Sequence, residues 1–198
     1  NFINPDLPLP PQFEYQGSIK TQLNRPLNCL WAARLDEQKR LNFFFDIVKE
    51  CNFCNFDMFG QAVVGTNPNI PILPNLTYHG GYNSFGELVT HKNYDAFVFT
   101  TKYEGLPNTL IEAGAWGLPI VAPNVGGIGE LVNDKTGYLL REDSSVEDYI
   151  QALKEIEKNP EQAKAKVVAM RKLIAERHSW KEFSKNVSMI PGYLNQTE

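Results

Sequence analysis

The chain has 198 residues, of which 42% are hydrophobic and 21% are charged. These values are ordinary for a globular protein of one domain or slightly more, and they exclude a disordered, collagen-like or disulfide-scaffold chain. The formal net charge is −4, from 19 lysines and arginines against 23 aspartates and glutamates. Because nucleic acids and anionic membranes attract clustered positive charge, we expect neither as a partner.

The beginning of the chain differs from the rest. It reads NFINPDLPLPPQFEY, without a starting Met and without a basic-then-apolar leader, which indicates an excerpt from a longer protein. Residues 1–26 are rich in proline and show little periodicity, so we interpret them as a linker or arm and residues 27–198 as one folded domain. No run approaches the roughly 20 apolar residues that span a bilayer, so we expect no transmembrane segment.

From residue 27 onward, short apolar runs alternate with amphipathic segments. In chain order they predict a strand at 27–33, a helix at 38–50, a strand at 56–59, a loop or small hairpin at 65–74, a strand at 76–79, a helix at 84–91, a strand at 95–100, a helix at 107–116, a strand at 120–122, a helical turn at 128–132, a strand at 137–140, and helices at 146–157, 161–176 and 180–187. Continuously apolar strands separated by helices predict a parallel sheet with helices on both faces, which is a doubly wound, Rossmann-like α/β domain. Ligands of such sheets bind beyond the carboxyl ends of the strands, so the loops there are the candidate site.

The loop after the first strand carries two cations, Arg34 and Lys39, five residues apart. A helix N-terminus adds unpaired backbone N–H groups and a partial positive charge, so this turn suits an anion such as a phosphate. The alternative is a surface turn in which Asp36 and Glu37 form salt bridges with the two cations.

The loop after the fourth strand is rich in groups that bind sugars and phosphates. Gly105 permits close approach of the backbone or an unusual φ, and Pro107 suits a first helical turn. Glu112 lies about one turn into the helix and shares a face with Asn108, and Glu104 stands just before it. A carboxylate accepts two hydrogen bonds and so suits vicinal hydroxyls. The alternative is that Glu104 only complements the helix dipole and that Glu112 is a solvated side chain.

Residues 104–132, EGLPNTLIEAGAWGLPIVAPNVGGIGELV, run from this helix through a strand into a glycine-rich turn. They resemble the signature of the GT-B retaining glycosyltransferases of family 4, the glycosyl transferases group 1. Two glutamates with seven residues between them are its hallmark, as in Glu104 and Glu112. RLxxxK at 34–39, HGGY at 79–82, TGYLL at 136–140 and SWKEF at 179–183 resemble the rest of the pattern in the same order. The resemblance covers residues 27–187 and implies the C-terminal, donor-binding half of a GT-B fold.

The resemblance also implies roles for four charged residues. Arg34 and Lys39 would hold the donor diphosphate and stabilise the charge on the leaving nucleotide. Glu104 would bind hydroxyls of the transferred sugar, and Glu112 would bind the ribose. No nucleophile is implied, because the family is thought to react with retention on one face of the sugar.

The remaining donor contacts come from two loops. Backbone groups facing the phosphate and sugar would be those of Gly105, Leu106, Pro107 and Asn108. Tyr82 and Phe85 would flank the base. We expect no metal and no cofactor, because the two cations and the helix dipole would already neutralise the charge of the diphosphate. The sequence also has no Asp-x-Asp motif. The CxxC at 51–54 has no second pair and no nearby histidine, so it indicates reduced thiols rather than a zinc site.

For the full-length protein, the resemblance implies transfer of a sugar from a nucleotide-sugar to a glycan or lipid-linked acceptor, as in polysaccharide biosynthesis. The acceptor would bind through the N-terminal half, which this sequence lacks. The protein would be cytoplasmic, either free or at the inner face of the membrane. The sequence departs from the pattern at Ala33, which replaces the glycine usually found before the arginine, and at Leu106-Pro107, where many members have Phe-Gly. The second departure keeps the helix start intact but leaves the donor open. A non-catalytic nucleotide-sugar-binding module and a GT-B sugar epimerase stay open as alternatives.

Several conspicuous residues are more simply structural than functional. We expect His79 and His91 to end a strand and a helix rather than to bind a ligand, and His178 to cap or pack near a helix. Trp31 and Trp116 are expected in the core.

Overall fold

A six-stranded parallel sheet forms the centre of the molecule. The computed structural model describes residues 25–63 and 68–190. The strands stand in the order β3-β2-β1-β4-β5-β6. Their bounds are β1 Leu27–Ala32, β2 Cys54–Phe59, β3 Leu76–Tyr78, β4 Ala96–Val98, β5 Ile120–Pro123 and β6 Tyr138–Leu140. The predicted doubly wound fold is therefore confirmed, strand by strand. The predicted arm at 1–26 lies, except for its last two residues, outside the described part of the chain.

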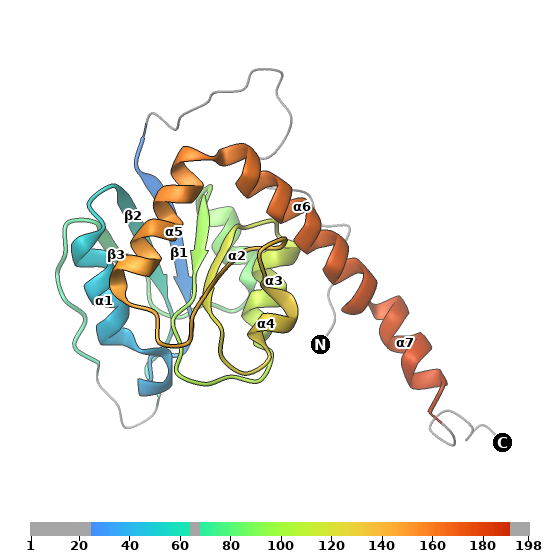
Figure 1. Cartoon of the computed structure of the whole chain (residues 1–198). Helices are drawn as coiled ribbons and strands as arrows, with labels where there is room; N and C mark the ends of the chain where they lie inside the picture. The colour runs from blue at the N-terminus through green and yellow to red at the C-terminus, as the bar shows by residue number, and fades with distance from the viewer. Residues whose placement is uncertain (1–24, 64–67, 191–198) are drawn as a thin grey trace.

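Helices cover both faces of the sheet (Figure 1). Residues of α1 and α5 pack on one face, and those of α2, α3, α4 and the second half of α6 pack on the other. The helices are α1 Leu41–Glu50, α2 Phe85–His91, α3 Asn108–Ala115, α4 Ile128–Leu131, α5 Val146–Lys158, α6 Pro160–Arg177 and α7 Trp180–Ser188. Burial on both faces explains why the strands read as continuous apolar runs rather than as alternating ones.

Alternate side chains of strand β1 contribute to the two hydrophobic cores on opposite faces of the sheet. Cys29 and Trp31 point into the core under α1 and α5, whereas Leu30 and Ala32 point into the opposite one. Trp31 stacks on Phe44 of α1 with ring centroids 5.1 Å apart, so its predicted place in the core is confirmed.

Two predicted helix starts are wrong, and so is one core residue. The helix expected from residue 38 is interrupted, because Glu37–Lys39 form a 3₁₀ turn and Arg40 follows in a left-handed conformation with φ 54°. A non-glycine residue rarely adopts this conformation, so the pattern could not show the break. Pro107 has extended backbone and is the N-cap of α3, not part of its first turn. Trp116 is only partly buried and packs at the edge of the core.

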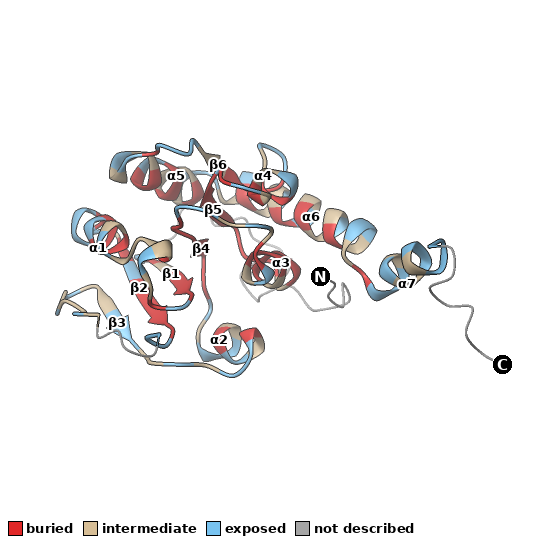
Figure 2. Cartoon of the chain, turned by 90° about the horizontal axis from the view of Figure 1, so that it is seen from below, coloured by how far each residue is buried: buried red, intermediate tan, exposed pale blue. Residues whose placement is uncertain are grey.

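The last two helices lead away from the sheet. Helix α6 packs on α3, and α7 continues outward from the body and has no buried residue (Figures 1 and 2). Among the residues that the structure describes, no helix combines the length and apolar character needed to cross a membrane.

Candidate functional site

Two of the predicted site residues, Lys39 and Glu104, meet where the strand order reverses. Strands β1 and β4 are neighbours in the sheet, but the chain winds outward from them in opposite directions. In open α/β sheets the loops at such a switch point diverge and leave room for a ligand. Here Lys39 comes from the loop after β1 and Glu104 from the loop after β4. Their side chains form an ion pair between Nζ and Oε1, and each is only about a tenth exposed (10% and 11%).

The surroundings of this ion pair are fixed by further contacts. The Nζ atom of Lys39 lies 5.0 Å from the centre of the Phe99 ring, within the range of a cation–π contact. Thr101 Oγ1 donates to Glu104 Oε1 at 3.2 Å. With little water present, charges at this position act more strongly on a ligand than they would on an open surface.

The two loops are also joined through side chains that the sequence pattern did not single out. Thr100 Oγ1 donates to the carbonyl of Lys39 at 2.7 Å and accepts from Trp31 Nε1 at 3.0 Å. Gln38 Nε2 donates to the carbonyl of Tyr103 at 2.7 Å. The only signal for these residues in the sequence was their position inside the two loops. The contacts make the loops after β1 and β4 one preorganised unit.

Arg34 has a different environment from Lys39. Its side chain is 67% exposed, and its guanidinium lies 3.3 Å from Asp36 Oδ2 and 3.4 Å from Gln38 Oε1. Glu37 pairs with Lys102 at 2.7 Å. The surface turn considered as an alternative is therefore present in part, around Arg34. The structure brings Lys39 to Glu104 but leaves Arg34 at the solvent edge.

The glycine-rich turn before α4 packs directly on the acidic loop. A Cβ added to Gly126 would lie 1.8 Å from the carbonyl oxygen of Glu104, and its φ is +55°. The neighbouring Gly127 N donates to the carbonyl of Gly105 at 3.0 Å. Gly105 itself has no positive φ, so the unusual φ considered for it is not observed. Nothing lies within 4 Å of a Cβ at Gly105, which leaves open space beside its backbone.

Helix α3 presents its first turn at the same edge. It begins at Asn108 without a side-chain cap and without an acidic residue in its first turn, so no side chain caps its N–H groups. Glu112 lies one turn further on, and burial raises the pKa of its carboxyl. Burial also raises the pKa of Tyr82, and the nearby charge of Glu112 adds to that shift. The charge of Glu112 therefore acts on Tyr82, and their roles toward a nucleoside stay predictions.

Phe85 does not lie where the sequence placed it. It is the first residue of α2, only 3% exposed, and packs edge-on against Phe97 with centroids 5.6 Å apart. Its ring belongs to the core and cannot flank a base. Leu106 is partly buried and packs against the same core.

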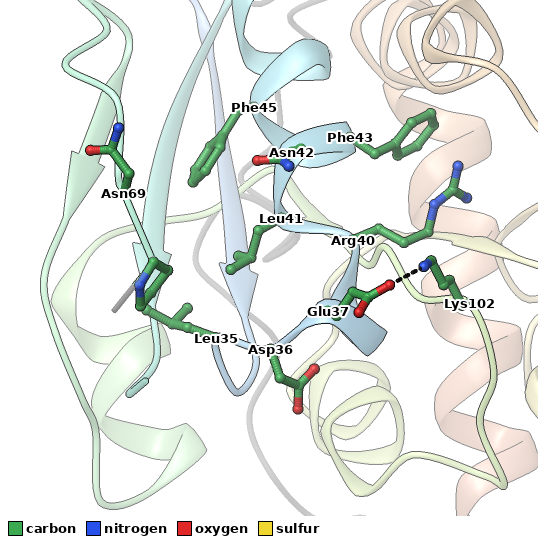
Figure 3. Close-up of a pocket in the computed structure, with 11 residues that line it drawn as sticks. Leu35, Asp36, Glu37, Arg40, Leu41, Asn42, Phe43, Phe45, Asn69 and Lys102 are labelled. Carbon is green, nitrogen blue, oxygen red and sulfur yellow. Dashed lines mark hydrogen bonds and ion pairs between the residues drawn. The ribbon is translucent and has the colours of Figure 1, made fainter. Parts of the chain in front are cut away.

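A cavity of about 590 Å³ lies next to these loops, on the side of α1 (Figure 3). Its apolar lining includes Leu41 and Phe45, and the Glu37–Lys102 ion pair lies among its polar residues. None of the residues predicted to contact the donor lines it. We therefore treat the cavity as separate from the candidate site.

Comparison with known proteins identifies the family of this chain. Residues 26–159 match the family described as glycosyl transferases group 1. The chain belongs to this family. It is 30% identical over 163 residues to an uncharacterised glycosyltransferase of Methanocaldococcus jannaschii, covering 80% of this chain and 43% of the relative. It is 36% identical over 72 residues to an uncharacterised glycosyltransferase of Haemophilus influenzae, covering 36% of this chain and 20% of the relative. The chain thus spans less than half the length of these relatives.

Solved structures of GT-B glycosyltransferases share the fold. HepE of Anabaena, in a complex with UDP, has a TM-score of 0.70 at 15% identity, over 83% of this chain and 49% of that one. Sucrose-phosphate synthase from Thermosynechococcus elongatus also has a TM-score of 0.70, at 18% identity, over 83% of this chain and 44% of that one. At these identities the likeness establishes the fold, and the sheet described above is that of one GT-B half.

Proposed function

We propose that this chain binds a nucleotide-sugar and is the donor-binding half of a retaining glycosyltransferase. The observation that carries the proposal is the shielded Lys39–Glu104 ion pair at the switch point of the sheet, beside the uncapped first turn of α3. Family membership supports the activity, and the geometry supports the assignment of individual residues.

Lys39 is suited to hold the diphosphate. Its ammonium has three N–H donors, of which Glu104 takes one, so the others are available to phosphate oxygens. Arg34, at the solvent edge, adds a second cation once a diphosphate covers the loop. Charge that develops on the leaving nucleotide would meet groups already in place, which is the main requirement for lowering the barrier of such a reaction.

The two glutamates are suited to different parts of the donor. Glu104 keeps a second carboxylate oxygen for sugar hydroxyls, next to the ammonium that holds the phosphate. Glu112 stands one helical turn away and acts electrostatically on Tyr82, which suits it to ribose hydroxyls near the base. In this scheme neither a metal nor a cofactor takes part.

The UDP and UDP-glucose complexes of HepE make uridine nucleotides the first probes to use. Calorimetric titration of the chain with UDP, GDP and ADP should reveal one diphosphate that binds saturably, at least about tenfold more tightly than its nucleoside. Lys49→Gln is the control, because this exposed lysine pairs only locally with Asp46 on α1 and should leave the affinity unchanged. Failure of all three diphosphates to bind would refute the proposal.

The same proposal predicts that the chain by itself binds the donor and transfers nothing. Acceptor binding is assigned to the part of the longer relatives that this chain does not cover. Incubation with a labelled UDP-sugar and an acceptor panel should yield no glycosylated product. Stoichiometric transfer of the sugar by the 198 residues alone would contradict the assignment of acceptor binding to another part of the protein.

A further inference from the structure

A second cluster of chemically active side chains lies outside the proposed donor site. Asp57 on β2, His79 directly after β3 and His91 at the end of α2 point their ligand atoms toward one another, all within 4.8 Å. Asp57 is buried, His79 is partly buried and His91 is exposed. One side of the cluster is thus open to solvent, and the other is anchored in the sheet.

The fold holds the two imidazole rings in place. Strand β3 pairs with β2 in parallel, and His79 N donates to the carbonyl of Met58 at 3.0 Å. The His79 ring stacks on Phe59, with centroids 4.5 Å apart and an interplanar angle of 10°. The His91 ring meets His79 at 4.6 Å and Phe59 at 5.7 Å, both edge-on. Two rings fixed in this way lose little freedom when they bind a common ion.

The carboxylate of Asp57 is oriented as well. Its Oδ1 atom lies 2.6 Å from His79 Nε2, a separation that requires a proton between the two atoms. Its Oδ2 atom accepts from Lys92 Nζ at 3.0 Å. Lys92 therefore holds one oxygen and leaves the other as a single ligand, as residues around metal ligands commonly do.

We propose that Asp57, His79 and His91 bind a divalent transition-metal ion of the zinc class. Two imidazole nitrogens and one carboxylate oxygen suit Zn²⁺, whereas Mg²⁺ and Ca²⁺ prefer oxygen ligands alone. The ion takes the place of the proton between His79 and Asp57, and that proton leaves to solvent. Water completes the coordination on the exposed side. The bound ion ties the end of β3 to α2, next to the loop that carries Tyr82.

The test is calorimetric titration of the tag-free, EDTA-treated chain with ZnCl₂ and, separately, with MgCl₂. One Zn²⁺ should bind per chain, and Mg²⁺ should not bind saturably. His91→Gln removes an exposed ligand without disturbing the core, and it should weaken Zn²⁺ binding at least about tenfold. His178→Gln removes the remaining histidine of the chain and should leave the affinity unchanged. Thermal unfolding of both variants confirms that each is folded.

Three outcomes would overturn the proposal. The first is the absence of saturable Zn²⁺ binding by the wild-type chain. The second is equal affinity in the wild type and His91→Gln, which would assign the ion to other groups such as the thiols of Cys29, Cys51 and Cys54. The third is an equal loss in His91→Gln and His178→Gln. UDP titration of His91→Gln keeps this test separate from the proposed function, since the variant leaves every proposed donor contact in place.

Discussion

Replacement of Lys39 by Met separates the structural from the binding role of this residue. Methionine keeps the length of the side chain but removes the charge, and Glu104 then remains at 11% exposure without its ammonium. Breaking a buried ion pair from one side costs about 3–5 kcal/mol, and the residual exposure of this pair favours the lower end, about 3 kcal/mol. Loss of a charge-assisted hydrogen bond to the diphosphate costs about 1.5–3 kcal/mol, which is roughly 10–150-fold in affinity for UDP.

Urea unfolding and calorimetric titration measure the two effects separately. The double variant Lys39→Met with Glu104→Gln replaces the pair by neutral groups, so it should recover most of the lost stability but none of the UDP affinity. Arg34→Met provides the comparison at an exposed position. It should weaken UDP binding while changing stability by no more than about 0.5 kcal/mol.

The reasoning would be refuted by either of two results. If Lys39→Met lowered the affinities for uridine and for UDP by the same factor, Lys39 would act on the fold and not on the phosphate. If the double variant regained UDP affinity together with stability, the loss of affinity in Lys39→Met would come from the unpaired carboxylate of Glu104 rather than from a missing phosphate contact.

Four further substitutions test the neighbouring residues. Glu104→Gln keeps an oxygen for Lys39, so it should change UDP affinity little and weaken a UDP-sugar by about 1–3 kcal/mol; an unchanged ratio of the two affinities would remove the sugar-binding role. Gly105→Ala should leave the midpoint of urea unfolding unchanged but lower the affinity for UDP. Gly126→Ala should lower the stability of the folded chain by at least about 1 kcal/mol, because Gly126 has φ +55° and a Cβ there would clash with the Glu104 carbonyl. Equal urea midpoints for the two variants would contradict this. Burial raises the pKa of Glu112 above its ordinary value of 4.5, so the stability linked to its protonated form is complete below pH 4.5 and is lost as pH rises through the folded-state pKa. Glu112→Gln should therefore raise the Tm at pH 7 but not near pH 4, and it should still lower the affinity for UDP. A lower Tm at pH 7 would contradict the inference that burial disfavours the charged carboxylate of Glu112.

The strands and the loops of the candidate site could be predicted because they depend on local pattern. A strand covered on both faces must be apolar throughout, and parallel strands place their following loops at one edge of the sheet. These two facts were enough to single out the two loops that carry Lys39 and Glu104, although 65 positions separate these residues in the chain.

The details that escaped prediction depend on contacts between distant segments. Pairing of Lys39 with Glu104 requires β1 to stand beside β4, and periodicity does not specify strand order. Arg40 adopts its left-handed backbone with its guanidinium 3.8 Å from the Phe43 ring centre, a contact invisible to helix propensity. Phe85 follows the N-cap Ser84 at a helix start, and only the position of Phe97 in the folded sheet decides that its ring points inward.

In the proposed function, the Lys39–Glu104 pair also links recognition of the phosphate to recognition of the sugar. A lone ammonium held away from water is costly, and a carboxylate partner offsets that cost. Here the carboxylate is itself assigned to the sugar, so a change at either residue alters the environment of the other. The effects of Lys39→Met and Glu104→Gln on UDP-sugar affinity should therefore be non-additive, with a coupling energy of about 0.5–3 kcal/mol. Arg34 and Glu112 share no partner in the described contacts, so their effects should add within about 0.5 kcal/mol. Additive behaviour of the first pair would mean that the two residues act on the donor independently.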